Sequence, residues 1–378
     1  MKAVTYQGIK NVEVREVNDP KIEKPDDIIV KITSSAICGS DLHLIHALVP
    51  NMPTDFIIGH EPMGIVEEVG PEVTNLKKGD RVIIPFNVSC GRCWYCEHDL
   101  TSQCDNSNPH GDAGGYFGFS ENFGGYAGGQ AEYLRVPYGN FTPFKIPEDS
   151  EVEDEQLVLI SDAASTAYWS VDHAGVKDGD TVVIFGCGPV GLLAQKFAWF
   201  KGAKRVIAVD YIQYRLQHAK RTNNVEIINF EDHENTGEYL KELTSGGADI
   251  VIDAVGMDAK FSDLEFLATG LKLQGGSMSA LVMATQAVRK GGTIQITGAY
   301  GGRYNGFPLG DIFNRNIDIK SGQAPVIPYM KHLYQLVSER KVDIGDVVTH
   351  VLPLDQAKHG YELFDTKMDE CIKVVLKP

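Results

Sequence analysis

The feature that most constrains the fold is the stretch from Thr181 to Asp210, which predicts a strand, a glycine turn, a helix and a second strand. Thr181–Phe185 is almost entirely apolar, as expected of a parallel strand covered on both faces. The next residues have the pattern G-x-G-x-x-G, and apolar residues then recur at helical spacing until Gly202. A second apolar run, Arg205–Val209, leads into Asp210, nineteen residues after the third glycine. The stretch therefore predicts one βαβ unit of a doubly wound parallel sheet.

This unit has the parts of a dinucleotide-binding site. The helix N-terminus offers unpaired N–H groups to a pyrophosphate, and the glycines let that group approach the backbone. Asp210 can accept hydrogen bonds from the adenosine ribose, and its charge should repel the 2′-phosphate of NADP, which favours NAD. A glycine cluster can also mark a plain turn, so the prediction depends on the flanking strand, helix and acid. The candidate cofactor-binding residues of the turn are Gly186, Gly188, Pro189, Val190 and Gly191.

The rest of the chain predicts two domains. The N-terminal part contains short alternating runs bounded by Gly, Pro or Asp, which are typical of a small barrel-like β domain. Strands and helices then alternate, and the C-terminal part returns to the first pattern with a helix at Pro328–Ser338 and a strand at Ile372–Leu376. We therefore expect a discontinuous catalytic domain, residues 1–163 and 322–378, into which a dinucleotide-binding domain, residues 164–321, is inserted.

Composition limits the partners. The chain has 378 residues and a formal net charge of −16, which argues against nucleic acid or an anionic membrane as a partner. The N-terminus has no apolar signal region, and no apolar run is long enough to span a bilayer, so we expect a cytoplasmic protein. Four of the seven cysteines crowd into fifteen residues, which fits a metal site better than a disulfide framework.

Those four cysteines are the most specific signal in the sequence. Their spacing is Cys90-x2-Cys93-x2-Cys96-x7-Cys104, and four thiolates in one short lobe can close a tetrahedral shell around Zn²⁺. A closed shell leaves no open position, so this site is predicted to be structural. The alternatives are four buried thiols or a reducible disulfide pair.

Cys38 and His60 suggest a second metal site. Alone, each could be an ordinary core cysteine or a hydrogen-bonded histidine. A catalytic zinc needs about three protein ligands and one open position, and this pair supplies two of the ligands.

The residues around His60 resemble a known zinc signature. The run Gly59-His60-Glu61-x2-Gly64-x5-Gly70-x2-Val73 is similar to that of the medium-chain, zinc-dependent alcohol dehydrogenase superfamily. The four-cysteine lobe, the glycine turn and the interrupted β domain follow in the same order, so the resemblance covers essentially the whole chain. It implies an α/β fold with a GroES-like β-barrel catalytic domain and an inserted Rossmann domain. It also implies NAD, two zinc ions per subunit and a homo-oligomer, dimer or tetramer.

The resemblance places a third zinc ligand at Asp162. The family carries this ligand just before the first helix of the coenzyme domain, often as cysteine, and the matching segment here is Ser161–Tyr168. An aspartate at that position resembles the branch of glutathione-independent formaldehyde dehydrogenases and formaldehyde dismutases. The segments Gly124–Tyr133 and Cys371–Leu376 also resemble that branch. Without the resemblance, Asp162 would be interpreted as a helix N-cap.

Further roles follow from the resemblance. Ser40 would contact the reacting oxygen and His43 would carry the proton onward, although alone they could be a turn residue and a surface side chain. Glu61 would be a second-shell residue or a transient fourth ligand. Thr166 would touch the nicotinamide, and Lys373 would neutralise the pyrophosphate rather than being an exposed lysine on an edge strand. One departure is Gly39, which stands where many members have a basic residue facing the phosphates.

A glycine-rich segment does not fit a flexible linker. Gly111–Gly129 holds eight glycines in nineteen residues, interleaved with aromatic side chains, whereas flexible linkers are polar. We expect an ordered loop that covers the active site or cofactor or packs at a subunit interface; an ordinary surface loop is the alternative. The resemblance also aligns Phe86 with a pocket residue of the family, which, with Trp169 as a second candidate, implies a small apolar substrate pocket.

The sequence thus predicts a zinc- and NAD-dependent dehydrogenase of small alcohols or aldehydes, with formaldehyde as one candidate substrate. The alternatives are a formaldehyde dismutase that retains NAD, a polyol or threonine dehydrogenase, and a non-catalytic zinc and NAD redox sensor. The joint presence of Cys38, His60, Asp162 and Ser40 argues against the sensor.

Overall fold

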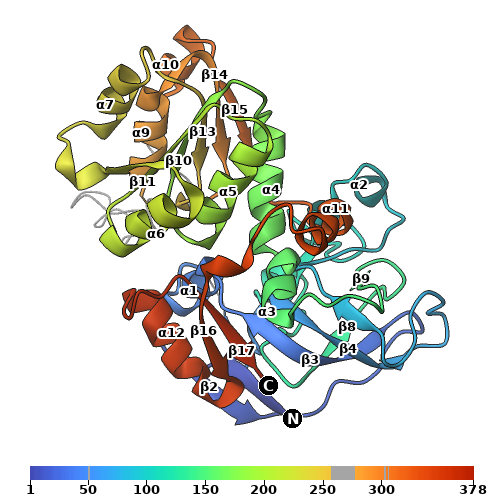
Figure 1. Ribbon diagram of the computed structural model, residues 1–378. Helices are drawn as coiled ribbons and strands as arrows, with labels where there is room; N and C mark the ends of the chain where they lie inside the picture. Colours follow the sequence, from blue (N-terminus) through green and yellow to red (C-terminus); the bar gives the residue numbers. More distant parts are fainter. Residues whose placement is uncertain (50–51, 257–276, 302–303, 305) are drawn as a thin grey trace. The chain divides into compact units, whose positions relative to one another are not determined.

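The computed structural model describes residues 1–49, 52–256, 277–301, 304 and 306–378 (Figure 1). It divides into two compact units. The first combines Met1–Ser165 with Pro325–Pro378, and the second is the continuous segment Thr166–Ala324. The expected boundaries after residues 163 and 321 lie two and three residues away from these divisions.

The second unit contains the predicted parallel sheet. Its strand order is β12-β11-β10-β13-β14-β15, and every neighbouring pair is parallel. The direction of strand addition reverses between β10 and β13, which is where doubly wound sheets bind dinucleotides. The strands are β10 (Thr181–Phe185), β11 (Arg205–Asp210), β12 (Glu226–Asn229), β13 (Ala248–Asp253), β14 (Val288–Ile296) and β15 (Asp318–Ser321).

Helices pack on this sheet because their apolar stripes match its apolar strands. Leu240 of α7 and Leu281 of α9 join Val183 and Phe185 of β10 in one buried cluster. The helices are α4 (Ala163–Ala174), whose first three residues belong to the first unit, α5 (Pro189–Phe200), α6 (Gln213–Asn223), α7 (Thr236–Leu243), α9 (Ser279–Ala287) and α10 (Leu309–Asn314), with a 3₁₀ turn η4 (Phe230–Asp232).

The first unit is built on a sheet of order β16-β17-β3-β4-β5-β9, in which β8 also pairs with β3. The predicted barrel-like β domain is thereby confirmed, although β3 and β4 are longer than expected and β16 was not predicted. Two short ribbons, β1–β2 and β6–β7, accompany the sheet. The strands are β1 (Lys2–Tyr6), β2 (Val12–Glu16), β3 (Ile28–Ala36), β4 (Glu61–Val69), β5 (Arg81–Ile83), β6 (Asn87–Val88), β7 (Gly115–Tyr116), β8 (Tyr133–Val136), β9 (Phe144–Lys145), β16 (Val348–Pro353) and β17 (Lys373–Lys377).

Helix α12 was not predicted. Its residues Tyr361, Leu363 and Phe364 are buried in a core cluster with Ile37 and Leu44, so α12 closes one side of this unit (Figure 1). The remaining helices are α1 (Gly39–Ile45), α2 (Trp94–Glu97), α3 (Asp154–Leu157), α11 (Ile327–Ser338) and α12 (Ala357–Thr366), with 3₁₀ turns η1 (Thr101–Gln103), η2 (Glu121–Phe123), η3 (Val158–Ser161), η6 (Gly345–Val347) and η7 (Leu354–Gln356).

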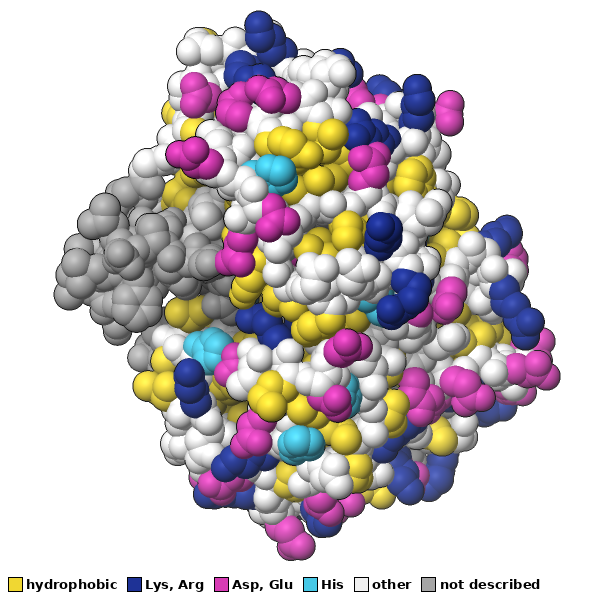
Figure 2. All heavy atoms as spheres, turned by 60° about the vertical axis from the view of Figure 1, so that its left-hand side comes forward, with side chains coloured by type: hydrophobic (Ala, Val, Ile, Leu, Met, Phe, Trp, Pro, Cys, Tyr) yellow, Lys and Arg dark blue, Asp and Glu magenta, His cyan; other side chains and the backbone are white. Residues whose placement is uncertain are grey.

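The surface carries both signs of charge. On the face shown in Figure 2, acidic and basic side chains are interspersed among apolar ones. This face therefore has no large patch of acidic side chains, although the net charge of the chain is −16. Within the described part of the chain, no helix has the length and apolarity needed to cross a membrane.

Candidate active site and zinc centres

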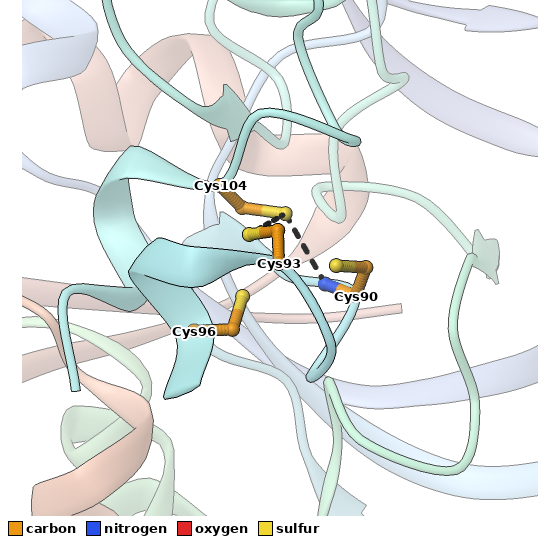
Figure 3. Close-up of side chains that lie close together, drawn as sticks. All are labelled: Cys90, Cys93, Cys96 and Cys104. Carbon is orange, nitrogen blue, oxygen red and sulfur yellow. Dashed lines mark hydrogen bonds between the residues drawn. The ribbon is translucent and has the colours of Figure 1, made fainter. Parts of the chain in front are cut away.

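The four-cysteine lobe brings its sulfurs together (Figure 3). The Sγ atoms of Cys90, Cys93, Cys96 and Cys104 all lie within 4.8 Å of one another. The chain turns at Gly91, whose φ of +73° suits glycine, and Cys93 and Cys96 are one helical turn apart at α2. This arrangement fits a closed tetrahedral zinc site.

Backbone and side-chain donors contact the sulfurs of Cys90 and Cys104. The Cys90 N–H lies 3.3 Å from Cys104 Sγ, and Cys90 Sγ accepts from Arg92 N–H at 3.4 Å and from Asn106 Nδ2 at 3.1 Å. Hydrogen bonding from Cys96 lowers the pKa of the Cys104 thiol, the same hydrogen bond raises the pKa of Cys96, and burial raises the pKa of Cys90. Because zinc binds the thiolate, these donors favour metal binding.

The second cluster joins residues from three separate segments. One ligand atom from each of Cys38, His60, Glu61 and Asp162 lies within 4.8 Å of the others. Asp162 Oδ2 is 3.6 Å from Cys38 Sγ and 3.4 Å from His60 Nε2. All four residues are buried, and they all belong to the first unit. The sequence-predicted ligands Cys38, His60 and Asp162 therefore converge on one point.

Local structure explains this convergence. Cys38 follows β3 and is the N-cap of α1, His60 directly precedes β4, and Asp162 lies between η3 and α4. Strands β3 and β4 are antiparallel neighbours in which Ala36 pairs with Glu61, so their ends place Cys38 beside His60. The Phe86 N–H donates to the Ser161 carbonyl at 3.1 Å, which fixes the segment carrying Asp162.

The donor set fits a zinc ion. Glu61 Oε2 is buried and has no hydrogen-bond partner among the described residues, and such a buried carboxylate oxygen needs a counter-charge. Burial raises the pKa of the Cys38 thiol to about 11. Burial alone would lower the pKa of His60, but the charges of Asp41 and Cys38 raise it well above its ordinary value. Metal binding would therefore displace protons from this site.

Lys373 is the partner of Glu61. Its Nζ lies 2.7 Å from Glu61 Oε1, and both side chains are at most 1% exposed. Burial raises the pKa of Glu61, and the charge of Lys373 opposes that shift. The alternative of an exposed edge-strand lysine is wrong, because β17 lies between β16 and β3. Contact between Lys373 and a cofactor pyrophosphate stays a prediction.

Asp41 is a site residue that sequence reasoning missed. Asp41 Oδ1 lies 3.0 Å from His60 Nδ1, while Oδ2 accepts from the Cys38 N–H at 3.0 Å. A carboxylate on Nδ1 fixes the imidazole so that Nε2 faces the metal position. The available signal was the capping pattern Cys38-x2-Asp41, which places an acid in the first turn of α1.

The proposed proton carriers lie on α1. Ser40 Oγ is 3.9 Å from Cys38 Sγ, and His43, one turn further along the helix, is 6% exposed. Residues three apart share one face of a helix, so Ser40 and His43 lie one after the other along the same face of α1. Their roles in proton transfer stay predictions.

The glycine-rich segment packs against the metal site, so the alternative of an ordinary surface loop is wrong. A Cβ at Gly118 would lie 2.4 Å from the Gly59 carbonyl oxygen, and one at Gly128 would lie 2.1 Å from the Ile58 oxygen. Only glycine allows the loop to lie this close to the backbone that precedes His60. The rings of Phe119 and Phe86 stand edge-on to His60, with centroids 6.1 and 6.3 Å away.

The glycine turn of the second unit has the expected geometry. Gly186 has φ of +95°, and a Cβ at Gly191 would lie 1.9 Å from the Gly186 carbonyl oxygen. Among the described residues, a Cβ at Gly188 would approach only the Arg215 guanidinium, at 3.9 Å, so none of them crowds this side of the turn. Pro189 occupies the first turn of α5, where a backbone N–H would have no partner within the helix, so the absence of an N–H in proline costs no hydrogen bond. Val190 follows it.

Asp210 and Arg215 flank this turn. Asp210 accepts from the Cys187 N–H at 2.7 Å and from the Tyr211 and Ile212 N–H groups at 2.7 and 2.9 Å. Arg215 Nε is buried and lacks a hydrogen-bond partner among the described residues, and its guanidinium lies 5.9 Å from the centre of the Tyr214 ring. Arg215 was not predicted. Thr166 lies in α4, and Trp169 stacks on His173 within the second unit.

Comparisons with known proteins agree with this geometry. Residues 24–148 match the model of the alcohol dehydrogenase GroES-like domain, and residues 189–273 match that of the zinc-binding dehydrogenase. The chain is 74% identical to the zinc-type alcohol dehydrogenase-like protein AdhB of Bacillus subtilis, over 100% of both chains. The chain belongs to the zinc-type alcohol dehydrogenase family. The resemblance inferred from the sequence is thereby confirmed, together with the fold and the oxidoreductase class.

More distant members of the zinc-type alcohol dehydrogenase family also match over the full length. A glutathione-independent formaldehyde dehydrogenase of Pseudomonas aeruginosa is 33% identical, over 100% of this chain and 97% of that protein. The solved structure of alcohol dehydrogenase TADH from Thermus sp. ATN1 superimposes with a TM-score of 0.86 at 33% identity, covering 100% of this chain and 99% of that one.

Proposed function

We propose that the chain is a zinc-dependent dehydrogenase that transfers a hydride between NAD(H) and a small alcohol or aldehyde. The observation that carries this proposal is the convergence of Cys38, His60 and Asp162 beside an aromatic wall. We use this name for the connected rings of Phe86, Tyr116, Phe119 and Phe123. Three ligands from separate segments would leave a fourth position for the reacting oxygen, which Glu61 could occupy transiently. A sensor would need no such open position, so the dehydrogenase is favoured.

Each group has a defined task in this proposal. Zinc held by Cys38, His60 and Asp162 supplies a Lewis acid that lowers the pKa of an alcohol or an aldehyde hydrate. Ser40 would accept the proton of the substrate hydroxyl while it passes its own hydroxyl proton on to His43, which would release a proton towards water. Glu61, paired with Lys373, holds a negative charge close to the metal position while water or product exchanges. The four-cysteine lobe holds a second, structural zinc.

NAD is the proposed cofactor. In this proposal Asp210 faces the ribose and Thr166 faces the nicotinamide. The residues that face the pyrophosphate are those of the glycine turn: Gly186, Gly188, Pro189, Val190 and Gly191. The uncrowded side of Gly188 and the Arg215 Nε donor, which lacks a hydrogen-bond partner among the described residues, support an anionic ligand at this turn. Asp210 places a negative charge beside that donor, which supports NAD over NADP.

Removing the charge of Asp210 should relax the preference for NAD. Asp210→Asn keeps one of the two oxygens that accept backbone N–H groups, turns an amide N–H towards the other N–H, and loses the repulsion of a 2′-phosphate. We expect the ratio of kcat/KM for NADP to that for NAD to rise about 10-fold, equivalent to about 1.4 kcal/mol. Asp210→Gly should shift the ratio in the same direction. Steady-state kinetics with both cofactors measure it, and an unchanged ratio in both variants would reject Asp210 as the selector.

The aromatic wall indicates a small substrate. Phe119 packs on Phe123 with ring centroids 5.1 Å apart, and Phe123 stacks on Tyr116 at 4.8 Å. Tyr116 in turn contacts Phe86 at 5.1 Å. These connected rings restrict the space beside His60, because packed aromatic side chains leave little room to move.

Shortening this wall should admit larger substrates. Phe119→Ala is expected to raise kcat/KM for hexanol relative to ethanol about 10-fold or more, since pocket contacts discriminate by about 1–3 kcal/mol per methylene. The matched control is Phe144→Ala, because Phe144 is a partly buried phenylalanine that contacts Tyr334 and not His60. An unchanged substrate ratio in Phe119→Ala, or an equal change in the control, contradicts the assignment.

The substrate itself is identified by a panel. Zinc-loaded protein is mixed with NAD and formaldehyde, short alcohols, threonine or polyols, and NADH is followed by absorbance. NADH formation with one class supports the dehydrogenase and names its substrate. Consumption of formaldehyde without net NADH would identify the dismutase instead. A panel with neither signal, in protein shown to bind NAD and zinc, would favour the sensor.

We also propose that the protein forms homo-oligomers, either dimers or tetramers. Leu309 and Phe313 of α10 are 65% and 79% exposed, and β15 is the last strand of its sheet in the described part of the chain. An edge strand beside exposed apolar side chains can pair with a second copy about a two-fold axis. Light scattering of the purified protein gives the subunit number.

A further inference from the structure

A buried chain of polar contacts leads from α12 to His60. Tyr361 Oη donates to Gln130 Oε1 at 2.9 Å, and Gln130 Nε2 donates to Asp41 Oδ2 at 3.3 Å. Asp41 Oδ1 then lies 3.0 Å from His60 Nδ1. The four residues are at most 4% exposed, so water does not compete for these contacts.

The surroundings of Gln130 determine which way its amide points. Its Nε2 faces two acceptors, the Asp41 carboxylate and the Ala36 carbonyl oxygen, both at 3.3 Å. A rotated amide would turn Oε1 towards these two oxygens, so that they would lose the Gln130 donor and face a third oxygen, which is unfavourable in a buried site. Tyr361 fills the other end by donating to Oε1. The amide therefore has one satisfied orientation.

Gly59 leaves the space through which Gln130 reaches Asp41. Gly59 has φ of +94°, and a Cβ on it would lie 2.2 Å from Gln130 Cγ. The backbone of Gln130 is also held, because its N–H donates to the Ile58 carbonyl at 3.2 Å and its carbonyl accepts from Val4 at 2.8 Å. A residue other than glycine at position 59, directly before His60, would thus clash with the Gln130 side chain.

We propose that Gln130 and Tyr361 are positioning residues for the catalytic zinc, acting through Asp41 on the orientation of His60. The inference rests on the proposed function, in which His60 binds that zinc. Asp41 Oδ1 and His60 Nδ1 form an ion-pair contact at 3.0 Å, and neither atom has a hydrogen-bond partner among the described residues. The placement of this pair therefore depends on what holds Asp41 Oδ2. Two donors hold that oxygen: the Cys38 N–H and the Gln130 amide.

Two variants test the proposal without large changes in volume. Gln130→Met removes the amide but keeps a side chain of similar length, and Tyr361→Phe removes only the hydroxyl. Zinc release to a chromogenic chelator is measured, and the catalytic ion is the release phase that His60→Ala lacks. We expect this phase to be about 10-fold faster in Gln130→Met, at the lower end of the effect of outer-shell partners, and less accelerated in Tyr361→Phe. Release from the four-cysteine lobe should stay unchanged.

A second readout separates positioning from stability. Cobalt(II) exchanged into the catalytic site should show shifted d–d absorption bands in both variants, because the imidazole orientation changes. The control is Tyr138→Phe, since Tyr138 is also buried and donates to a backbone carbonyl, that of Asn106, at 3.0 Å. It should leave the cobalt bands as in the unmodified protein.

Wild-type release rates and cobalt bands in both variants, with only a lower melting temperature, would overturn the inference. A protein in which His60→Ala leaves turnover and zinc content intact would instead refute the proposed function. The two failures are therefore distinguishable.

Discussion

Replacing His60 with alanine is expected to abolish turnover while the protein stays folded. His60 contributes one of three protein ligands to the proposed catalytic zinc, and its loss also leaves Asp41 buried without its imidazole partner. The remaining Cys38 and Asp162 cannot hold the ion in an open tetrahedral site. We expect zinc content to fall from two ions to one per chain and kcat to fall by about 10³-fold or more. Metal analysis and NADH absorbance measure the two effects.

A second histidine of the same unit provides the control. His46 Nε2 lies 3.1 Å from a carboxylate oxygen of Asp365, away from the metal cluster, so His46→Ala removes an ion pair but no ligand. It should retain both zinc ions and most of the activity, with a stability loss of about 1 kcal/mol or less. Full activity in His60→Ala, or equal losses in the two variants, would reject the catalytic zinc site.

Replacing Cys104 with alanine is expected to destabilise the first unit strongly. Cys104 is fully buried, and its Sγ lies 3.8 Å from Cys93 Sγ and 3.3 Å from the Cys90 N–H. The lobe has little secondary structure of its own, with α2 only four residues long, so metal binding must supply much of its folding free energy. We expect loss of the structural zinc and a fall in the free energy of unfolding of about 4 kcal/mol or more. Thermal unfolding with metal analysis measures both.

Cys371→Ala is the matched control for this variant. Cys371 is also fully buried but belongs to an apolar cluster with Tyr361 and Phe364 rather than to a group of sulfurs. Its replacement should lower stability by about 1 kcal/mol and leave both zinc ions in place. If Cys104→Ala kept two zinc ions per chain, the four-cysteine assignment would be wrong.

The sequence was most informative where chemistry imposes a spacing. The four cysteines lie close along the chain because one short lobe must surround one ion, and the glycine turn is fixed by a local strand–turn–helix geometry. Both patterns can be recognised without knowing the rest of the fold. Asp162 could be placed only through the resemblance, because it is 124 residues from Cys38 and nothing local distinguishes it from a helix cap.

Contacts that depend on tertiary packing were not predictable. Tyr361 and Gln130 are 231 residues apart, and each has an ordinary local sequence context. Lys373 lies on a strand that alternation alone could assign to an edge, whereas β17 is an interior strand with a buried ion pair. Helix α12 escaped prediction because its apolar stripe is short and is complemented by residues near the other end of the chain.

In the sequence, the two segments of the first unit lie before and after the second unit, and this order has a consequence for biosynthesis. Strands β16 and β17 are translated only after the whole parallel sheet, yet β17 pairs with β3, made more than three hundred residues earlier. While the ribosome adds the intervening residues, the Ser35–Ala36 end of β3 lacks its final neighbour, and exposed strand edges promote aggregation. The inserted unit can fold as soon as it emerges, since domains generally fold as units. Nascent chains paused before residue 348 should therefore depend on chaperones that shield strand edges.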